Sequence, residues 1–208
     1  MENKFDLKAG EWDNNNLRVD RALNVASAIK KQIKINKKMK ALEFGSGTGL
    51  LGFNLIEDVA YLTFIDTSKE MLEQVNMKLA NNRIKNAGTL NCDLSNESLN
   101  EKYDLIFSLM ALHHIANYKE ILKKLTSALN PSGFICISDL DKEDGSFHGA
   151  EENVPYFGFE RDDIVKTLKN NGIKNIKVST VYVNKKVVNN KLKEFPVFLI
   201  AGQKNTDE

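Results

Sequence analysis

Hydrophobic positions along the chain fall into two patterns, short continuous runs and sets spaced three or four residues apart. Continuous runs of strand length predict strands, whereas the wider spacing predicts amphipathic helices. Strands are expected at 39–44, 61–65, 87–91, 103–109, 134–138, 176–183 and 197–202. Helices are expected at 13–34, 48–56, 67–81, 118–129 and 160–171. Strands that alternate with helices predict βαβ units around a parallel sheet.

The connections between these elements add detail. Thr67 and Glu70 have the spacing of a capping box, and Gly172 suits the end of the last helix. Residues 130–133, Asn-Pro-Ser-Gly, suit a type I turn with proline at its second position. No helix separates the last two strands, so they are expected to pair antiparallel. Segment 139–159 lacks a clear period, and irregular connections of that length tend to be functional.

Composition fits one large globular domain. The chain has 208 residues, of which 42% are hydrophobic and 27% are charged. We expect one α/β domain over 1–203, with an N-terminal helical segment to about residue 36 and a disordered tail at 204–208. The net charge of +1 gives no general attraction to nucleic acid. No stretch approaches the ~18 apolar residues of a membrane span.

The N-terminal residues and the cysteines concern the cellular compartment. Residues 1–10 are polar and show no apolar core of a secretory signal. Cys92 and Cys136 both have apolar neighbours, and two cysteines cannot form a disulfide framework. We therefore expect buried free thiols in a reducing cytoplasm.

A glycine-rich loop follows the first strand. The segment Leu-Glu-Phe-Gly-Ser-Gly-Thr-Gly, residues 42–49, lets the backbone turn sharply and approach a ligand closely. It does not match a phosphate-binding P-loop, which needs a lysine at fixed spacing. A dinucleotide fingerprint fits from Gly47 through Gly49 to Gly52, with Asp66 near the expected distance. The loop also has the GxGxG form of S-adenosylmethionine enzymes, with Glu43 two residues before the first glycine. A glycine turn without a ligand is the remaining interpretation.

Two carboxylates follow the next strands. Asp66 directly follows the second strand, where it can accept hydrogen bonds from both hydroxyls of a ribose. Asp93 follows the third strand, where it can accept one from an adenine amino group. With the fourth strand, the Asn-Pro-Ser-Gly turn and the closing antiparallel pair, these features resemble the class I S-adenosylmethionine-dependent methyltransferases of small-molecule type, over about residues 11–204. The resemblance implies a doubly wound, Rossmann-like seven-stranded sheet, mostly parallel, with the last strand antiparallel beside the fifth.

The resemblance also implies S-adenosylmethionine as cofactor, S-adenosylhomocysteine as product, and a set of contacts. The glycines would line the methionine and ribose, Asp66 would hold the ribose hydroxyls, and Asp93 would take the adenine amino group. Trp12, in a segment that folds over the cofactor in related enzymes, is equally well explained as a hydrophobic anchor. The residues expected at the cofactor are Trp12, Glu43, Gly45, Ser46, Gly47, Gly49, Asp66, Thr67, Met71, Cys92, Asp93, Leu94 and Ser108.

The chemistry of transfer sets what else is needed. A sulfonium methyl group is already activated, so positioning and exclusion of water are the main tasks. A general base is needed only if the acceptor loses a proton, and His113, His114 and His148 are the candidates. The first two histidines also suit backbone hydrogen bonds. The acceptor is expected to meet Phe147, His148, Tyr156 and Phe157.

Other possibilities stay open on the sequence. Arg18 and Arg21 on the first helix can approach a carboxylate or be solvated. The histidine spacing matches no strong metal site, so no metal is expected. Besides a methyltransferase for a small molecule, an NAD-type oxidoreductase and a non-catalytic S-adenosylmethionine-binding protein remain. A nucleic-acid methyltransferase is disfavoured by the neutral charge, and no membrane partner is expected. A monomer or a homodimer is expected, and the acceptor is not identified.

Overall fold

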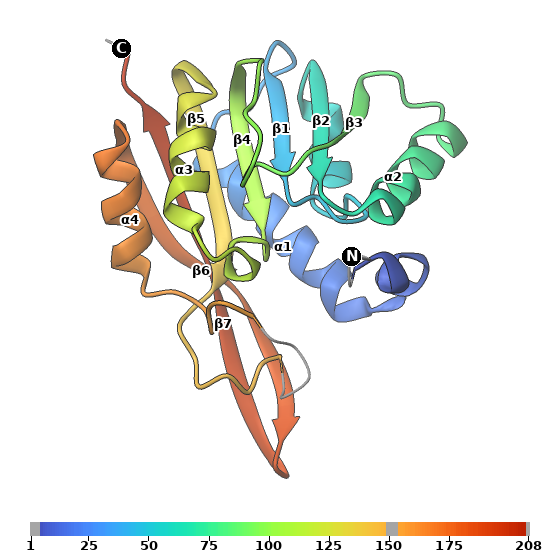
Figure 1. The fold of residues 1–208 in the computed structure, drawn as a ribbon, viewed down its shortest axis with the longest axis vertical. Coiled ribbons are helices and arrows are strands. Elements are labelled where there is room, and N and C mark those ends of the chain that lie inside the picture. The colour runs from blue at the N-terminus through green and yellow to red at the C-terminus, as the bar shows by residue number, and fades with distance from the viewer. Residues whose placement is uncertain (1–4, 149–153, 207–208) are drawn as a thin grey trace.

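A seven-stranded sheet forms the centre of the computed structural model, which describes residues 5–148 and 154–206. Across the sheet the strand order is β3-β2-β1-β4-β5-β7-β6 (Figure 1). β1 to β5 run parallel, and β7 inserts antiparallel between β5 and β6. The strands are β1 (Lys40–Phe44), β2 (Tyr61–Asp66), β3 (Ala87–Asn91), β4 (Tyr103–Leu109), β5 (Leu129–Leu140), β6 (Ile173–Val188) and β7 (Lys191–Lys204). The fold class expected from the sequence is confirmed.

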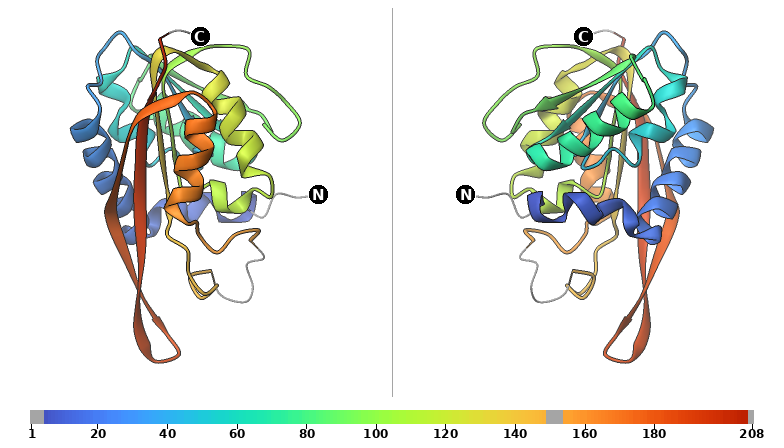
Figure 2. Two further views of the ribbon diagram at one scale, coloured as in Figure 1. Left: turned by 90° about the vertical axis from the view of Figure 1, so that its left-hand side faces the viewer. Right: turned by 90° about the vertical axis from the view of Figure 1, so that its right-hand side faces the viewer.

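Helices cover both faces of this sheet (Figure 2). One face packs on α1 (Asn16–Gln32), α2 (Lys69–Asn81) and the short 3-10 turns η2 (Gly52–Asn54) and η3 (Ile56–Asp58). The other face packs on α3 (Tyr118–Ser127) and α4 (Arg161–Asn170). Two further 3-10 segments are η1 (Asp6–Asn14) and η4 (Leu112–His114).

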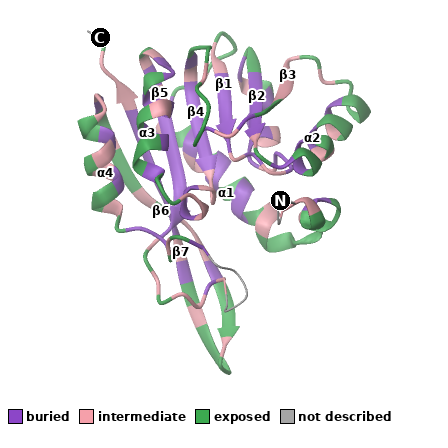
Figure 3. Ribbon diagram, viewed as in Figure 1, coloured by how far each residue is buried: buried purple, intermediate pink, exposed green. Residues whose placement is uncertain are grey.

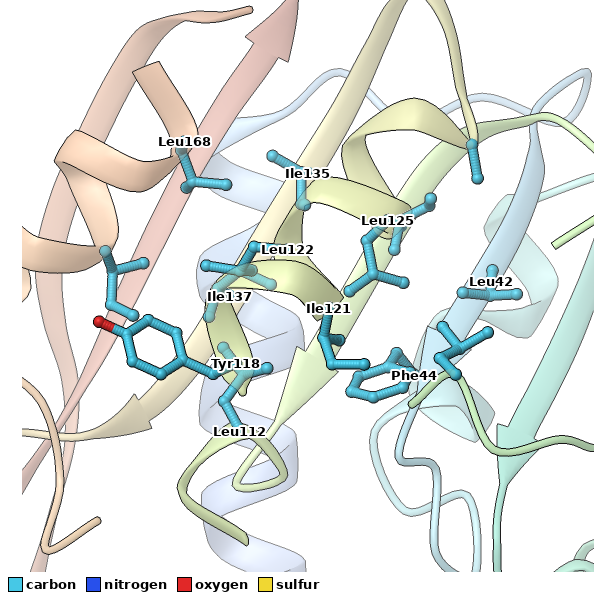
Figure 4. Packing of buried hydrophobic residues seen from close by; sticks show 14 of the residues in the cluster. Leu42, Phe44, Leu112, Tyr118, Ile121, Leu122, Leu125, Ile135, Ile137 and Leu168 are labelled. Atoms are coloured by element: carbon cyan, nitrogen blue, oxygen red, sulfur yellow. The ribbon is translucent and has the colours of Figure 1, made fainter. Parts of the chain in front are cut away.

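The core explains which strands are central. Figure 3 shows β1, β4 and β5 buried over most of their length, as expected for parallel strands covered on both faces. Under α3, Ile121, Leu122 and Leu125 pack on Leu42 and Ile135 (Figure 4). The three helix residues lie at the spacing of one helix face, which is buried in the core. The rigid layer they form holds the strand ends in place.

One predicted helix is absent. Residues 48–56 were expected to be helical, but they form the 3-10 turns η2 and η3. An α-helix here would bond the Gly52 N–H to the Thr48 carbonyl oxygen. Instead the Gly52 N–H donates to Glu43 Oε2 at 3.0 Å, and the Thr48 carbonyl accepts from Lys78 Nζ at 2.8 Å. Both partners of that helical bond are thus taken by side chains from distant elements.

The last hairpin is longer than expected. The polar stretch between the two predicted strands continues the ladder, so that β6 and β7 pair from Ile173 and Lys204 to the tip. Asn189 and Asn190 at the tip both have positive φ, as tight hairpin turns require. The hairpin extends past the carboxyl end of β5 (Figure 1). It therefore brings the polar half of β6 to the edge where the site lies.

Smaller boundaries also differ from the expectations. The N-cap of α2 is Ser68, whose Oγ accepts from the Met71 N–H, rather than Thr67. The expected turn at 130–133 lies inside β5 as an irregularity opposite β4. β7 includes Lys204, and residues 207–208 of the expected tail lie outside the described part of the chain. Gly172 follows the α4 cap with a φ of 79°, as predicted.

Candidate functional site

A cavity of about 570 Å³ lies at the carboxyl edge of the parallel strands. Ligands bind at this edge in open α/β sheets, where the strand order reverses, and here that point lies between β1 and β4. The N-terminal segment, α1, the loops after β1 to β4, the end of segment 141–148 and β6 supply its walls. The predicted residues that line the cavity are Trp12, Glu43, Gly45, Ser46, Gly47, Asp66, Thr67, Met71, Cys92, Asp93, Leu94, His113, His114, Phe147 and His148.

The glycine loop forms one wall, and its glycines differ in role. Gly45, Gly47 and Gly49 all have positive φ, which favours glycine. A Cβ on Gly47 would have Met71 Sδ at 3.9 Å and Trp12 Nε1 at 4.0 Å as its nearest neighbours, so space for a ligand remains there. A Cβ on Gly49 would instead come within 2.9 Å of Phe53 and Phe64. Gly49 therefore serves packing and does not line the cavity.

Asp66 is held by the backbone at the end of β2. Its Oδ2 accepts from the Gly47 N–H at 2.7 Å, and its Oδ1 accepts from the Ser68 N–H at 2.9 Å. Burial raises the pKa of Asp66, and the Ser68 and Gly47 N–H groups oppose that shift. Each carboxylate oxygen keeps acceptor capacity toward the cavity. The carboxylate is thus oriented for two hydroxyl donors.

Asp93 and Cys92 lie at the other end of this wall, after β3. Asp93 accepts from the Ser95 N–H at 2.8 Å and from Asn96 Nδ2 at 2.9 Å, so its turn is fixed locally. Burial and the neighbouring Glu97 raise the pKa of Cys92 to about 11. The thiol is therefore protonated at neutral pH and acts as an apolar wall beside Asp93.

Glu43 lies deeper, under the glycine loop. The side chain is 2% exposed, and its hydrogen bond from the Gly52 N–H replaces the missing helical bond. Burial raises the pKa of Glu43 well above its usual value, against the stabilising Gly52 N–H. Ser46 Oγ is also buried, and no hydrogen-bond partner is found for it in the described residues. The floor of the cavity thus offers polar atoms to a polar ligand group.

The N-terminal segment, residues 5–15, contains η1 and precedes α1. It packs over the glycine loop and is called the roof below. Asp13 accepts from Thr48 Oγ1 at 2.5 Å and forms an ion pair with Lys78, while Asp6 Oδ1 accepts from Ser68 Oγ at 2.6 Å. Each contact joins the segment to an element far along the chain. No local sequence signal marks these two aspartates, and sequence reasoning missed them.

Trp12 completes that roof. Its ring carries the Arg18 guanidinium at 3.7 Å from the centroid, and Arg18 Nη1 donates to the Trp12 carbonyl at 3.2 Å. The side chain faces Gly47. Trp12 therefore lines the cavity and contacts α1 through Arg18.

Three histidine rings lie together in the wall of the cavity. The ring centroid of His113 lies 4.0 Å from that of His114 and 4.8 Å from that of His148. His113 Nδ1 is 2.6 Å from Asp139 Oδ1, and both side chains are buried. His113 Nε2 is buried and has no hydrogen-bond partner among the described residues. A histidine oriented by a carboxylate through one ring nitrogen leaves the other for proton transfer.

Some expected residues lie elsewhere. Ser108 is buried and donates to the Phe44 carbonyl at 2.8 Å, joining β4 to β1. Tyr156 donates its hydroxyl to the Ala116 carbonyl at 2.8 Å and packs on Tyr118. Phe157 is 49% exposed and lies near Gly145. None of these three side chains belongs to the cavity wall.

The structure adds wall residues that the sequence did not indicate. Asn184 and Lys186 reach the cavity from the polar half of β6. Lys186 Nζ donates to the Phe147 carbonyl at 2.5 Å and lies 4.5 Å from the centroid of its ring. The strand was predicted to end at residue 183, so neither Asn184 nor Lys186 was expected to lie at the site.

The local geometry also decides between the two glycine motifs. A dinucleotide fingerprint places its glycines where a strand leads into an α-helix. Here no α-helix forms in residues 48–58, and residues 52–54 and 56–58 are short 3-10 turns. Gly52, the third glycine of that register, faces Glu43 and Phe64 in the core instead. The GxGxG reading of the loop, with its acid at Glu43, fits the structure better.

Comparisons with known proteins agree with this geometry. Residues 42–135 match a family model described as a methyltransferase domain. An uncharacterized methyltransferase of Schizosaccharomyces pombe is 29% identical over 156 residues, which is 67% of this chain and 55% of that protein. Malonyl-[acyl-carrier protein] O-methyltransferase 2 of Ilyobacter polytropus is 31% identical over 104 residues, which is 49% of this chain and 39% of that protein. The chain thus spans about half or less of the length of these relatives.

Solved structures share the fold. The YcgJ protein of Bacillus subtilis has a TM-score of 0.72 at 12% identity, over 87% of this chain and 98% of that one. Phosphoethanolamine N-methyltransferase 2 of Haemonchus contortus, in complex with S-adenosylmethionine, has a TM-score of 0.71 at 15% identity, over 86% of this chain and 52% of that one. The open face of Gly47, the oriented Asp66 and the buried Ser46 hydroxyl fit such a nucleoside. Residues 42–135 thus match a methyltransferase domain, the chain has the fold of the class I S-adenosylmethionine-dependent methyltransferases, and S-adenosylmethionine is the cofactor that these comparisons support.

Proposed function

We propose that the protein transfers the methyl group of S-adenosylmethionine to a small-molecule acceptor, with His113 as general base. The observation that carries this proposal is that one cavity is lined both by the glycine loop and by His113, whose ring is paired with the buried Asp139 carboxylate. A binding protein without activity would not need an oriented histidine on the acceptor side. An NAD-type oxidoreductase is disfavoured by the 3-10 turns at residues 48–58.

The cofactor would be held by residues after β1, β2 and β3. We assign the ribose hydroxyls to Asp66, the adenine amino group to Asp93, and the methionine end to the floor formed by Glu43 and Ser46. Trp12 and its segment would cover the bound molecule. S-adenosylmethionine supplies an activated sulfonium methyl group for in-line displacement. The chain then has to position the acceptor and exclude water.

His113 would handle the proton. The short contact between Nδ1 and Asp139 favours the tautomer in which Nδ1–H donates to the carboxylate. That tautomer leaves the Nε2 lone pair to take a proton from the acceptor as the new bond to carbon forms. The Asp139 carboxylate stabilises the resulting imidazolium. His114 and His148 line the same wall and would shape the acceptor's place beside it.

Several observations support a small molecule rather than a polymer. The cavity of about 570 Å³ suits a cofactor with a small partner. The net charge of +1 gives little attraction to nucleic acid.

No helix in residues 5–148 or 154–206 is long and apolar enough to cross a membrane. The two buried thiols support a reducing, cytoplasmic location.

Calorimetric titration with S-adenosylmethionine, S-adenosylhomocysteine and NADH tests the cofactor first. We expect micromolar binding of the two sulfur nucleosides and none of NADH.

A second experiment tests His113 as general base, with an acceptor found in a panel of small acids and amines. The His113→Ala substitution should lower kcat by about 100-fold or more, the usual contribution of a general base. Its affinity for S-adenosylhomocysteine should stay unchanged. Tighter binding of NADH, or an unchanged kcat in His113→Ala, would contradict the proposal.

A further inference from the structure

Arg21 is a buried cation on the wall of the cavity. It lies in α1, is 9% exposed, and lines the cavity. Its Nη1 donates to Asn184 Oδ1 at 2.9 Å, while its Nε is buried without a hydrogen-bond partner. No ion pair joins Arg21 to a carboxylate of the described residues. Burial lowers the pKa of Arg21 to about 10, which records the cost of keeping the charge there.

The guanidinium has one edge left for a ligand. Asn184 is itself fixed, because its Nδ2 donates to the Phe195 carbonyl at 3.3 Å. With Nη1 taken by Asn184, the edge formed by Nε and Nη2 carries two parallel N–H groups. That edge matches the two oxygens of a carboxylate, which is the most specific partner of arginine. A buried cation that has an unpartnered donor is strongly stabilised when an anion binds to it.

The position of Arg21 separates it from the cofactor residues. Asp66 and Asp93 follow β2 and β3 on one side of the sheet, whereas Asn184 belongs to β6 at the opposite edge. Between β1 and β6 lie β4, β5 and β7, and neighbouring strands are about 4.8 Å apart. The charges that act on Arg21 are those of Arg18, Tyr182 and Asp139, and Asp139 is the partner of His113. Arg21 thus belongs to the acceptor side of the cavity.

We propose that the acceptor carries a carboxylate that Arg21 binds through its Nε–Nη2 edge, with Asn184 fixing the guanidinium. This inference rests on the proposed function and names the class of its substrate. The carboxylate anchors the acceptor, and a different atom receives the methyl group, because hydrogen bonds from a cation make an oxygen less nucleophilic. The anchor places that other atom toward His113.

The test uses the whole protein saturated with S-adenosylhomocysteine. Calorimetry would measure binding of succinate and 4-hydroxybenzoate, of their matched amides succinamide and 4-hydroxybenzamide, and of inorganic phosphate. We expect at least one acid to bind, with its amide and phosphate at least about tenfold weaker, as expected for loss of a bidentate charged contact. Arg21→Met should weaken that acid by about tenfold or more and leave the affinity for S-adenosylhomocysteine unchanged.

Controls separate the possible failures. Lys30→Met, on the exposed face of the same helix, should change neither affinity. Arg21→Lys keeps the charge without the fork, and should retain part of the acid binding if Arg21→Met folds poorly. Binding of no acid, preference for phosphate, or a loss of S-adenosylhomocysteine affinity in Arg21→Met would overturn the inference. Absence of S-adenosylhomocysteine binding in the wild type would instead contradict the proposed function itself.

Discussion

At the residue scale, two acids that line the cavity are held by backbone N–H groups rather than by cations. Asp66 accepts from Gly47 and Ser68, and Glu43 accepts from Gly52. Such bonds orient a carboxylate without consuming its charge in an ion pair. The cost is desolvation, which raises the pKa of both acids. For Asp66, the arrangement suits the uncharged ribose hydroxyls that we propose it binds.

Glu43 makes the pH dependence of stability testable. Its folded pKa lies above its unfolded value, so between the two the folded state binds more protons and stability falls as pH rises. The slope for one proton is at most about 1.4 kcal/mol per pH unit. Glu43→Gln removes this titration and keeps an oxygen for the Gly52 N–H.

Urea unfolding of both proteins from pH 4.5 upward would measure the effect. As pH rises above about 4.5, we expect the free energy of unfolding of Glu43→Gln to increase relative to that of the wild type. This difference should become constant once Glu43 is ionised in the folded protein. A difference that is constant with pH would show that burial does not perturb this carboxyl.

At the element scale, the helices and strands that could be predicted from sequence were those determined by their own local sequence pattern. Strands 87–91 and 103–109 were predicted with their observed bounds, and α2 and α3 deviate only at their ends. The helix at 48–56 failed because Glu43 and Lys78 take its hydrogen-bonding groups, and neither is local to it. The hairpin was underestimated because polar residues pair as well as apolar ones when the ladder leaves the core.

Gly52 tests why the loop after β1 avoids a helix. A Cβ at this position would come within 2.4 Å of Glu43 Oε2 and of the Phe64 ring. Gly52→Ala should therefore lower the free energy of unfolding by about 1–3 kcal/mol, the usual cost of overpacking. Gly10→Ala is the matched control, because a Cβ there meets nothing within 4 Å, and its effect should stay within about 0.5 kcal/mol. Equal effects in urea unfolding would refute this explanation.

At the scale of the whole molecule, the site depends on how distant segments close over one edge of the sheet. Asp66 and Asp93 could be predicted because the topology places every parallel strand end at that edge. Asp13 and Asn184 could not, because only tertiary closure brings the N-terminal segment and the hairpin to it. Tyr156 and Phe157 were misplaced for the same reason, since the path of a long loop has no periodic signal.

Closure of the roof gives a prediction of its own. Asp13→Asn removes the ion pair with Lys78 and keeps an oxygen for the Thr48 hydroxyl. A partly exposed pair of this kind contributes roughly 0.5–1 kcal/mol, so the roof should open about two to five times more often. Hydrogen–deuterium exchange of residues 5–15 would measure this. Asp20→Asn, exposed on α1, should leave exchange unchanged, and unchanged exchange in Asp13→Asn would mean that the pair does not fasten the segment.

The placement of Trp12 in the roof has a practical consequence. The chain contains a single tryptophan, and its indole lies between the Arg18 guanidinium and the open face of Gly47. Excitation at wavelengths that tyrosine does not absorb therefore addresses one side chain, which contacts the space a nucleoside would fill. The protein thus carries an intrinsic fluorophore for cofactor arrival and departure, and needs no label for its exchange kinetics to be followed.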